Sequence, residues 1–528
     1  KRLPSHGAAV RTDFALMASC GALHGSSAAA GIGRVSGVDV EKLEAGIVAG
    51  GDDATAPGSP RPSSSSGSTF AEEDEVATQE GKSEDVRRCV ALARFCTWMY
   101  PLSQRTAGDR SGGAPRLEAL DGPRWVASIQ IVLYHMYSTE PGLRQYFAWF
   151  SCWTQLFFLL SGFVLSYAEM AKPRRAGVSV FRYVRRRLTI IYPAFFLSLL
   201  LTVTYAPGKT AFEWSMLPLH ALLLQSWFPV CVTNDPASER PVSCSPWLYN
   251  GEAWFLSALL MFWLVLRPLA EFFRRRGLAF SSATLVVCWL FSFVFHLFGQ
   301  DSRLTEWLGC TDTLCPFVLM VAIRSTPLGY FHVFVAGVAS ARVFMLVAMK
   351  DAKTGERITA ETQRVTLSER SAPLLLRFGC CCGYLGYAGL VLLATPWIDS
   401  HLYFFHNGGL LPVMLLVLIG AAIGEDPVAV WVFRSRPMLV LGRISYLQYL
   451  MQHVLQGWIE RTFGWEDNRT AKLLFVPALM FFAYCCQRWV EKPYTEYQRG
   501  LQEKGVRGCD DRCIEGLEKA AATCFRVR

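Results

Sequence analysis

Charged residues are scarce in this 528-residue chain. They make up 18% of it, whereas 52% of the residues are hydrophobic. Soluble domains carry about 25% charged residues, so the composition excludes an ordinary soluble enzyme. Apolar runs of about 20 residues recur from Phe147 to Tyr484, and each is long enough to cross a bilayer. The sequence therefore predicts an integral, multi-pass membrane protein.

Two common site signals are also missing. None of the 17 cysteines forms a Cys-x-x-Cys pair with the spacing of a metal site. We therefore expect no metal and no cofactor. The formal charge of +9 comes largely from basic residues between apolar runs. That distribution is typical of membrane orientation and does not indicate a nucleic-acid partner.

Three regions differ in composition. Residues 1–119 are polar and of low complexity, so we expect a mostly disordered N-terminal region. Residues 120–495 hold the apolar runs and are predicted to form an all-α transmembrane bundle of about ten helices. Residues 496–528 are predicted to be a tail. The helices are expected near 121–139, 146–169, 188–205, 247–268, 277–299, 326–348, 377–397, 408–425, 438–459 and 470–489.

Basic residues gather in alternate loops of this map. Loops rich in Lys and Arg stay in the cytosol, so both chain ends are assigned there. An apolar stretch from Leu217 to Val230 is too short to span and is expected to be re-entrant or interfacial. The basic loops are 172–187, 272–277, 350–377 and 433–437.

Cysteines mark two of the predicted outer loops. Cys231 and Cys244 bracket one segment, and Cys310 and Cys315 lie in another. The outer compartment is oxidising, which favours disulfides. Free thiols are an equal alternative for both pairs.

Two basic side chains stand in the first apolar run, LDGPRWVASIQIVLYHMYS. Arg124 and His135 lie almost three helical turns apart, so both face one side of the helix, about 16 Å from each other along its axis. Interhelical bonding or anchoring at the membrane edge would explain them structurally. The functional alternative is a path through the membrane that ends at a basic histidine, because intramembrane ionisable groups are costly.

Several segments resemble, in order, the motifs of the acyltransferase type 3 family of integral membrane proteins. LDGPRWVASIQIVLYH keeps an arginine, ten residues and a histidine. The resemblance covers residues 120–495 and identifies them as the acyltransferase membrane domain. The other matching segments are QLFFLLSGFVLS (155–166), FRYVRRRLTIIYPAFFLSLLL (181–201), NGEAWFLSALLMFWLVLRP (250–268), RPMLVLGRISYLQYLMQH (436–453) and VEKP (490–493).

The chain departs from the family pattern in three places. Ile190 stands where a second arginine often precedes Tyr-Pro. Leu259 and Leu260 stand where many members carry a carboxylate. The histidine of the closing motif aligns with Gln452, and His453 is adjacent.

The resemblance implies transfer of an acyl group from cytosolic acyl-CoA to a hydroxyl of a carbohydrate or lipid acceptor on the far side of the membrane. His135 would be the catalytic residue, as general base or as acyl carrier. The expected donor-binding residues, which would hold phosphates, are Arg124, Arg185, Arg186 and Arg187. The expected acceptor-binding residues are Trp254, Ser257, Tyr449 and Gln452.

Structural alternatives accompany these roles. The arginine run could serve orientation alone, and the polar residues of the last motif could join helices. Ser161 lacks the context of a nucleophile, so the turn Ser161-Gly162-Phe163 is expected to pack closely against the first helix. A transporter or lipid flippase, or a non-catalytic sensor, would share the same map of spans. We find no matching pair of Gly/Pro-broken segments of the kind that marks transporter repeats.

The orientation can be tested directly. Epitope tags in 172–187, in 350–377 and at the C-terminus should all be accessible from the cytosol, because basic loops remain on that side. A tag in 231–246 should be protected. Protease digestion of sealed vesicles checks this, and finding 172–187 and 231–246 on the same side would contradict the map.

Overall fold

The computed structural model describes most of the predicted membrane domain. The expected disorder of the N-terminal region, the fate of Cys310 and most of the tail lie outside the described residues. All described residues belong to one compact unit, Glu84–Arg528. The described ranges are 116–137, 143–171, 180–205, 210–233, 242–300, 314–351, 365–367, 373–393, 404–463 and 469–503.

Each of the ten predicted spans overlaps a helix, which confirms the all-α fold class. The apolar runs form helices because a helix satisfies every backbone polar group within the segment, as a bilayer requires. The helices are α4 (Asp121–Tyr137), α6 (Thr154–Met170), α7 (Val180–Tyr205), α9 (Trp254–Arg274), α10 (Leu278–Gln300), α13 (Pro327–Ala348), α14 (Pro373–Leu393), α16 (Leu411–Ile423), α17 (Arg436–Phe463) and α18 (Arg469–Cys486).

Six helical segments in the described part of the chain are long and apolar enough to cross a membrane. Together with the shorter helices they form a multi-pass bundle. Helices α4, α14, α16 and α17 fall outside this set, although they pack within the same bundle. The six segments are Trp149–Met170, Val180–Tyr205, Gly251–Arg274, Leu278–Leu297, Val318–Ala348 and Thr470–Gln498.

Short elements connect and cap these helices. The helical ones are η1 (Glu118–Leu120), α5 (Arg144–Phe147), η2 (Ala148–Trp153), α8 (Ala211–Ala221), η3 (Ser245–Trp247), η4 (Gly251–Ala253), α12 (Leu314–Ser325), η6 (Phe405–Gly409), η7 (Ala429–Phe433), η8 (Gln487–Glu491) and α19 (Lys492–Glu503). The strands form two antiparallel pairs, β1 (Cys231–Thr233) with β2 (Val242–Cys244) and β3 (Met349–Asp351) with β4 (Val365–Leu367).

Of the two alternatives left open for Cys231 and Cys244, the structure shows the disulfide. The two residues face each other at the end of the β1–β2 pair and form a disulfide. The neighbouring apolar stretch is no span, as expected: α8 has 11 residues, and turns follow it. The backbone N–H of Ser226 and the indole of Trp227 donate to the hydroxyl and the carbonyl of Ser257, which ties these turns to α9.

Glycines set the contact between α6 and α13. A Cβ atom on Gly162 would lie 2.3 Å from the carbonyl oxygen of Phe334, and one on Gly337 would lie 2.2 Å from that of Leu159. Small residues let helices in a membrane approach closely. The expected close packing at Gly162 is therefore correct, but its partner is α13 and not the first helix.

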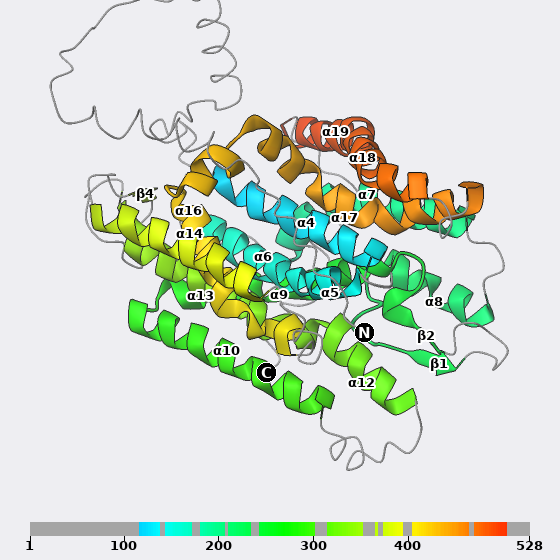
Figure 1. Ribbon diagram of the computed structural model, residues 1–528, viewed down its shortest axis with the longest axis horizontal. Coiled ribbons are helices and arrows are strands. Elements are labelled where there is room, and N and C mark those ends of the chain that lie inside the picture. The colour runs from blue at the N-terminus through cyan, green and yellow to red at the C-terminus, as the bar shows by residue number, and fades with distance from the viewer. Residues whose placement is uncertain are drawn as a thin grey trace, which may run out of the picture. The chain divides into compact units, whose positions relative to one another are not determined.

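Helices α4 and α17 run side by side (Figure 1). The Ser128 hydroxyl donates to the Ser445 carbonyl at 2.9 Å. Arg124 donates through Nε to the Ser445 hydroxyl at 2.9 Å and through Nη2 to the Gly442 carbonyl. A Cβ on Gly442 would lie 2.7 Å from the Asp121 carbonyl oxygen. Small and hydrogen-bonding residues thus fix the register of these two helices.

The α6–α13 contact gives a stability prediction. Gly162→Ala should lower the free energy of unfolding by about 1–3 kcal/mol, the usual cost of overpacking, because the added methyl meets backbone. Thermal unfolding of purified protein measures the effect. Gly277→Ala is the matched control, since no atom lies within 4 Å of its Cβ position. Equal melting temperatures for the two variants would contradict the packing argument.

Candidate functional site

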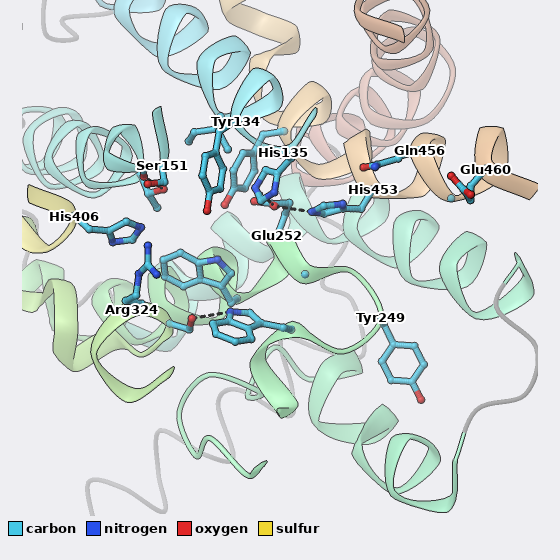
Figure 2. A pocket seen from close by; sticks show the side chains of 18 of the residues that line it. Tyr134, His135, Ser151, Tyr249, Glu252, Arg324, His406, His453, Gln456 and Glu460 are labelled. Atoms are coloured by element: carbon cyan, nitrogen blue, oxygen red, sulfur yellow. Dashed lines mark hydrogen bonds and ion pairs between the residues drawn. The ribbon is translucent and has the colours of Figure 1, made fainter. Parts of the chain in front are cut away.

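A cavity of about 730 Å³ lies among α4, η4, α12 and α17. Its walls combine aromatic rings with many charged and polar side chains, which can orient a ligand. Figure 2 shows three of these groups, His135, Glu252 and His453, converging at the middle of the cavity. The other polar and aromatic lining residues include Tyr134, Ser151, Thr154, Tyr205, Trp247, Tyr249, Trp254, Arg324, His406, Tyr449, Gln456 and Glu460.

The carboxylate of Glu252 is the centre of this group. Its side chain is 5% exposed, whereas those of His135 and His453 are 29% and 31% exposed. One oxygen, Oε1, lies 2.8 Å from His135 Nε2 and 3.0 Å from His453 Nε2. The hydroxyl of Tyr449 interacts with the same carboxylate. An ionised carboxylate only accepts hydrogen bonds, so a ring nitrogen must carry a proton to donate to it.

The turn before η4 directs Glu252 into the cavity. Tyr249 adopts a left-handed conformation with φ of 58°, which is uncommon for a residue with a side chain. Asn250 follows and accepts the backbone N–H of Glu252 at 3.2 Å. Its amide donates to the Ser198 hydroxyl and to the Leu450 carbonyl. Asn250 therefore anchors the turn to α7 and α17.

Tyr249 itself is held as a neutral donor. Its hydroxyl donates to the Glu213 carbonyl at 2.8 Å. Burial, and to a smaller extent the Glu213 carboxylate, raise the pKa of Tyr249. The strained turn is thus fixed from two sides, by Tyr249 and by Asn250.

The two imidazoles come from helices that already pack together. His135 lies near the end of α4, and His453 lies on α17. Their ring centroids are 4.8 Å apart in an edge-to-face arrangement. The α4–α17 contacts at Arg124 and Ser128 fix the register of the two helices, which brings both rings to the same carboxylate.

The opposite wall of the cavity carries Arg324 and His406 (Figure 2). His406 lies in η6, where Gly408 adopts φ of 111° and breaks the helix. The Asn407 amide donates to the carbonyls of Ile323 and Gly329, so it holds this break against α12 and α13. The Tyr330 hydroxyl bonds to His406 Nδ1.

The structure brings some of the predicted site residues together. His135, Trp254 and Tyr449 line the cavity. Ser257 lies one turn beyond Trp254 and bonds to the turns after α8. Gln452 is 1% exposed, and its amide atoms have no hydrogen-bond partner among the described residues.

The predicted donor-binding arginines occupy helix starts. Arg124 lies in the first turn of α4 and donates to Ser445 and Gly442 of α17, so it has a structural contact in addition to its expected role. The first turns of α7 hold Arg185, Arg186 and Arg187, of which Arg186 is exposed. The guanidinium of Arg187 lies 5.3 Å from the centre of the Tyr183 ring.

Sequence reasoning missed Glu252 and His453. The signal for Glu252 was a single acid directly before an apolar span, in NGEAWF. Family carboxylates are expected after Trp254, whereas this one precedes it. His453 stands one position beyond the residue that aligned with the family histidine. A residue one position later points about 100° further around a helix, and that rotation directs His453 toward Glu252.

Comparison with known proteins gives one match. The sequence model of the acyltransferase type 3 family, described as an acyltransferase domain, matches residues 117–486. Neither a curated protein nor a solved structure matches the chain significantly. The match covers more than half of the chain and includes all of the residues that converge on the cavity. The chain therefore belongs to the acyltransferase type 3 family and is an integral, multi-pass membrane protein.

Proposed function

We propose that the protein is a membrane-embedded O-acyltransferase in which His135 is the general base. The donor is cytosolic acyl-CoA, and the acceptor is a hydroxyl of a carbohydrate or lipid at the far side of the membrane. The observation that carries the proposal is the 2.8 Å contact between His135 Nε2 and the buried Glu252 carboxylate inside the cavity. An acid that orients an imidazole is the usual arrangement around a catalytic base.

The hydrogen bond determines which nitrogen is basic. Because Nε2–H donates to Glu252, the lone pair of the neutral His135 ring is on Nδ1. Nδ1 takes the proton of the acceptor hydroxyl while the hydroxyl oxygen attacks the thioester carbonyl of acyl-CoA. The C–S bond then breaks, and the thiolate leaves and takes the proton back. Glu252 stabilises the imidazolium in between, as a buried carboxylate does for a catalytic histidine.

His453 positions this pair. It donates to the same Glu252 oxygen at 3.0 Å, and its ring contacts the His135 ring edge-on. Two donors on one oxygen leave the carboxylate little freedom to rotate. We assign His453 and Tyr449 as positioning residues for Glu252, and Trp254 as an aromatic wall for the acceptor.

The donor site is assigned to the arginines at the start of α7. Acyl-CoA carries several phosphates, and arginine binds phosphate through a planar, bidentate fork. Arg185, Arg186 and Arg187 are the sixth to eighth residues of α7, beyond the first turn to which the helix dipole is confined, so the guanidinium groups themselves supply the positive charge. Arg124 contributes positive charge at the start of α4.

The catalytic assignment predicts a large and specific loss. His135→Ala and Glu252→Gln should each lower turnover of acyl-CoA and acceptor by about 10²–10⁴-fold, the usual contribution of a positioned base. Turnover is measured in reconstituted vesicles beside a melting curve. His135→Ala also removes one partner of the buried Glu252 carboxylate and so lowers stability, and the melting curve separates that loss from the loss of chemistry.

Glu460→Gln is the matched control for Glu252→Gln, because Glu460 also lines the cavity but is exposed. It should retain most of its turnover. Near-normal turnover of His135→Ala would contradict the catalytic role and favour a transporter or a sensor. A lost melting transition would instead assign His135 to helix packing.

The donor assignment predicts a different kinetic signature. Replacing Arg185, Arg186 and Arg187 by glutamine should raise the KM for acyl-CoA by roughly tenfold or more, since one hydrogen bond to a charged group is worth about 1.5–3 kcal/mol. The maximal rate should change less, because the contacts form in the ground state. Arg275→Gln, exposed and paired with Glu271, is the control. If KM is unchanged in protein that has inserted correctly, the three arginines serve only to orient the chain in the membrane.

A further inference from the structure

We propose that His135, Glu252 and His453 form a binding site for a divalent transition metal of the zinc class. Each residue offers one ligand atom, and the three atoms all lie within 4.8 Å of one another. They come from three elements, α4, η4 and α17, so the site exists only in the folded bundle. This proposal departs from the expectation of no metal, which rested on the absence of a cysteine pair.

The distances suit a tetrahedral ion after small side-chain movements. Zinc bonds of about 2.0–2.2 Å place two ligand atoms roughly 3.3 Å apart in a tetrahedron. The two nitrogen-to-Oε1 distances are 2.8 and 3.0 Å, so each must lengthen by only a few tenths of an ångström. The two ring nitrogens must approach each other by up to about 1.5 Å from their limit of 4.8 Å. Both rings are about 30% exposed, which leaves them room to rotate.

The donor set selects the class of metal. Imidazole nitrogen suits zinc, copper, nickel and iron, whereas calcium and magnesium require mainly oxygen ligands in sets of six or more. Two imidazoles and one carboxylate are a known zinc set, and the fourth position remains for a solvent molecule. That position opens to the cavity, which all three residues line.

Metal occupancy has a consequence for catalysis, and this step rests on the proposed function. An ion on His135 Nε2 needs the lone pair of that atom, so the ring proton moves from Nε2 to Nδ1. The number of protons is unchanged, but Nδ1 no longer has a lone pair for the acceptor hydroxyl. The ion also takes the Glu252 oxygen that would stabilise the imidazolium. Zinc should therefore inhibit acyl transfer by competing with the base.

The test uses tag-free protein that has been purified in detergent and stripped with a chelator. Co²⁺ is titrated at neutral pH, and its visible absorption reports tetrahedral coordination. Zn²⁺ is then added to displace it, and bound metal is counted by elemental analysis. Wild-type protein should bind one ion per chain. Glu252→Gln and His453→Gln should each weaken Co²⁺ binding by at least about tenfold. Mutation of a residue that only supports a metal ligand already lowers metal affinity by about 10–100-fold.

Two control variants keep the cavity but remove no ligand. Tyr134→Phe alters the wall beside His135, where the two rings meet at 4.9 Å, and Glu460→Gln removes a lining carboxylate. Both should bind Co²⁺ as the wild type does. Equal binding by the ligand variants, or no binding by the wild type, would overturn the site. A melting curve for each variant separates lost ligands from lost structure.

Turnover distinguishes failure of the site from failure of the proposed function. Stripped wild-type protein should transfer acyl groups, and Zn²⁺ should suppress the transfer in parallel with Co²⁺ displacement. Absent metal binding with full turnover would overturn the metal site and leave His135 as the base. If metal binds and only the metal-loaded protein turns over, zinc does not inhibit acyl transfer. The same result would contradict the proposal that His135 acts as a base without a metal.

Discussion

The carboxylate of Glu252 is the constraint on which the site depends. An ionised carboxylate removed from water costs several kcal/mol unless it is well paired. Here His135, His453 and Tyr449 supply the partners, and Asn250 fixes the backbone that carries it. A site held by partners from separate helices forms only when the whole bundle is assembled.

Asn250 extends this dependence to the surrounding helices. Its amide bonds to Ser198 of α7 and to the Leu450 carbonyl of α17, and Tyr449 on the same turn of α17 reaches Glu252. Helices α4 and α17 are held in register by hydrogen bonds far from the cavity. Rotation of either helix would separate an imidazole from the Glu252 carboxylate. The contacts that pack α4 against α17 therefore also position the residues of the site.

Close packing elsewhere gives the site a rigid frame. Helix α6 lies against α13 through facing glycines, Phe158 of α6 stacks on Tyr330 of α13, and the same Phe158 meets Phe262 of α9 edge to face. Association of helices in a membrane relies on such packing because lipid offers no hydrophobic drive. The same Tyr330 hydroxyl bonds to His406 at the far cavity wall. Tyr330 therefore links the packing of α6 against α13 to His406 at the cavity.

The helices could be predicted from the sequence because span length and apolar composition are local properties. His135 and Arg124 were also visible locally, as ionisable groups in an apolar run. Glu252 and His453 were not, because they lie 201 residues apart and meet only in the folded bundle. Gln452 shows the limit of motif alignment: a shift of one residue turns a helical side chain by about 100°, from the cavity to the packed interior.

The proposed mechanism requires that Glu252 fixes His135 in the tautomer that is protonated on Nε2. Nitrogen-15 NMR of histidine-labelled, metal-free protein in bilayers measures this directly, with His135→Gln identifying the resonances. We expect a protonated Nε2 and an unprotonated Nδ1 for His135, and loss of that preference in Glu252→Gln. A His135 ring protonated on Nδ1 alone would contradict it.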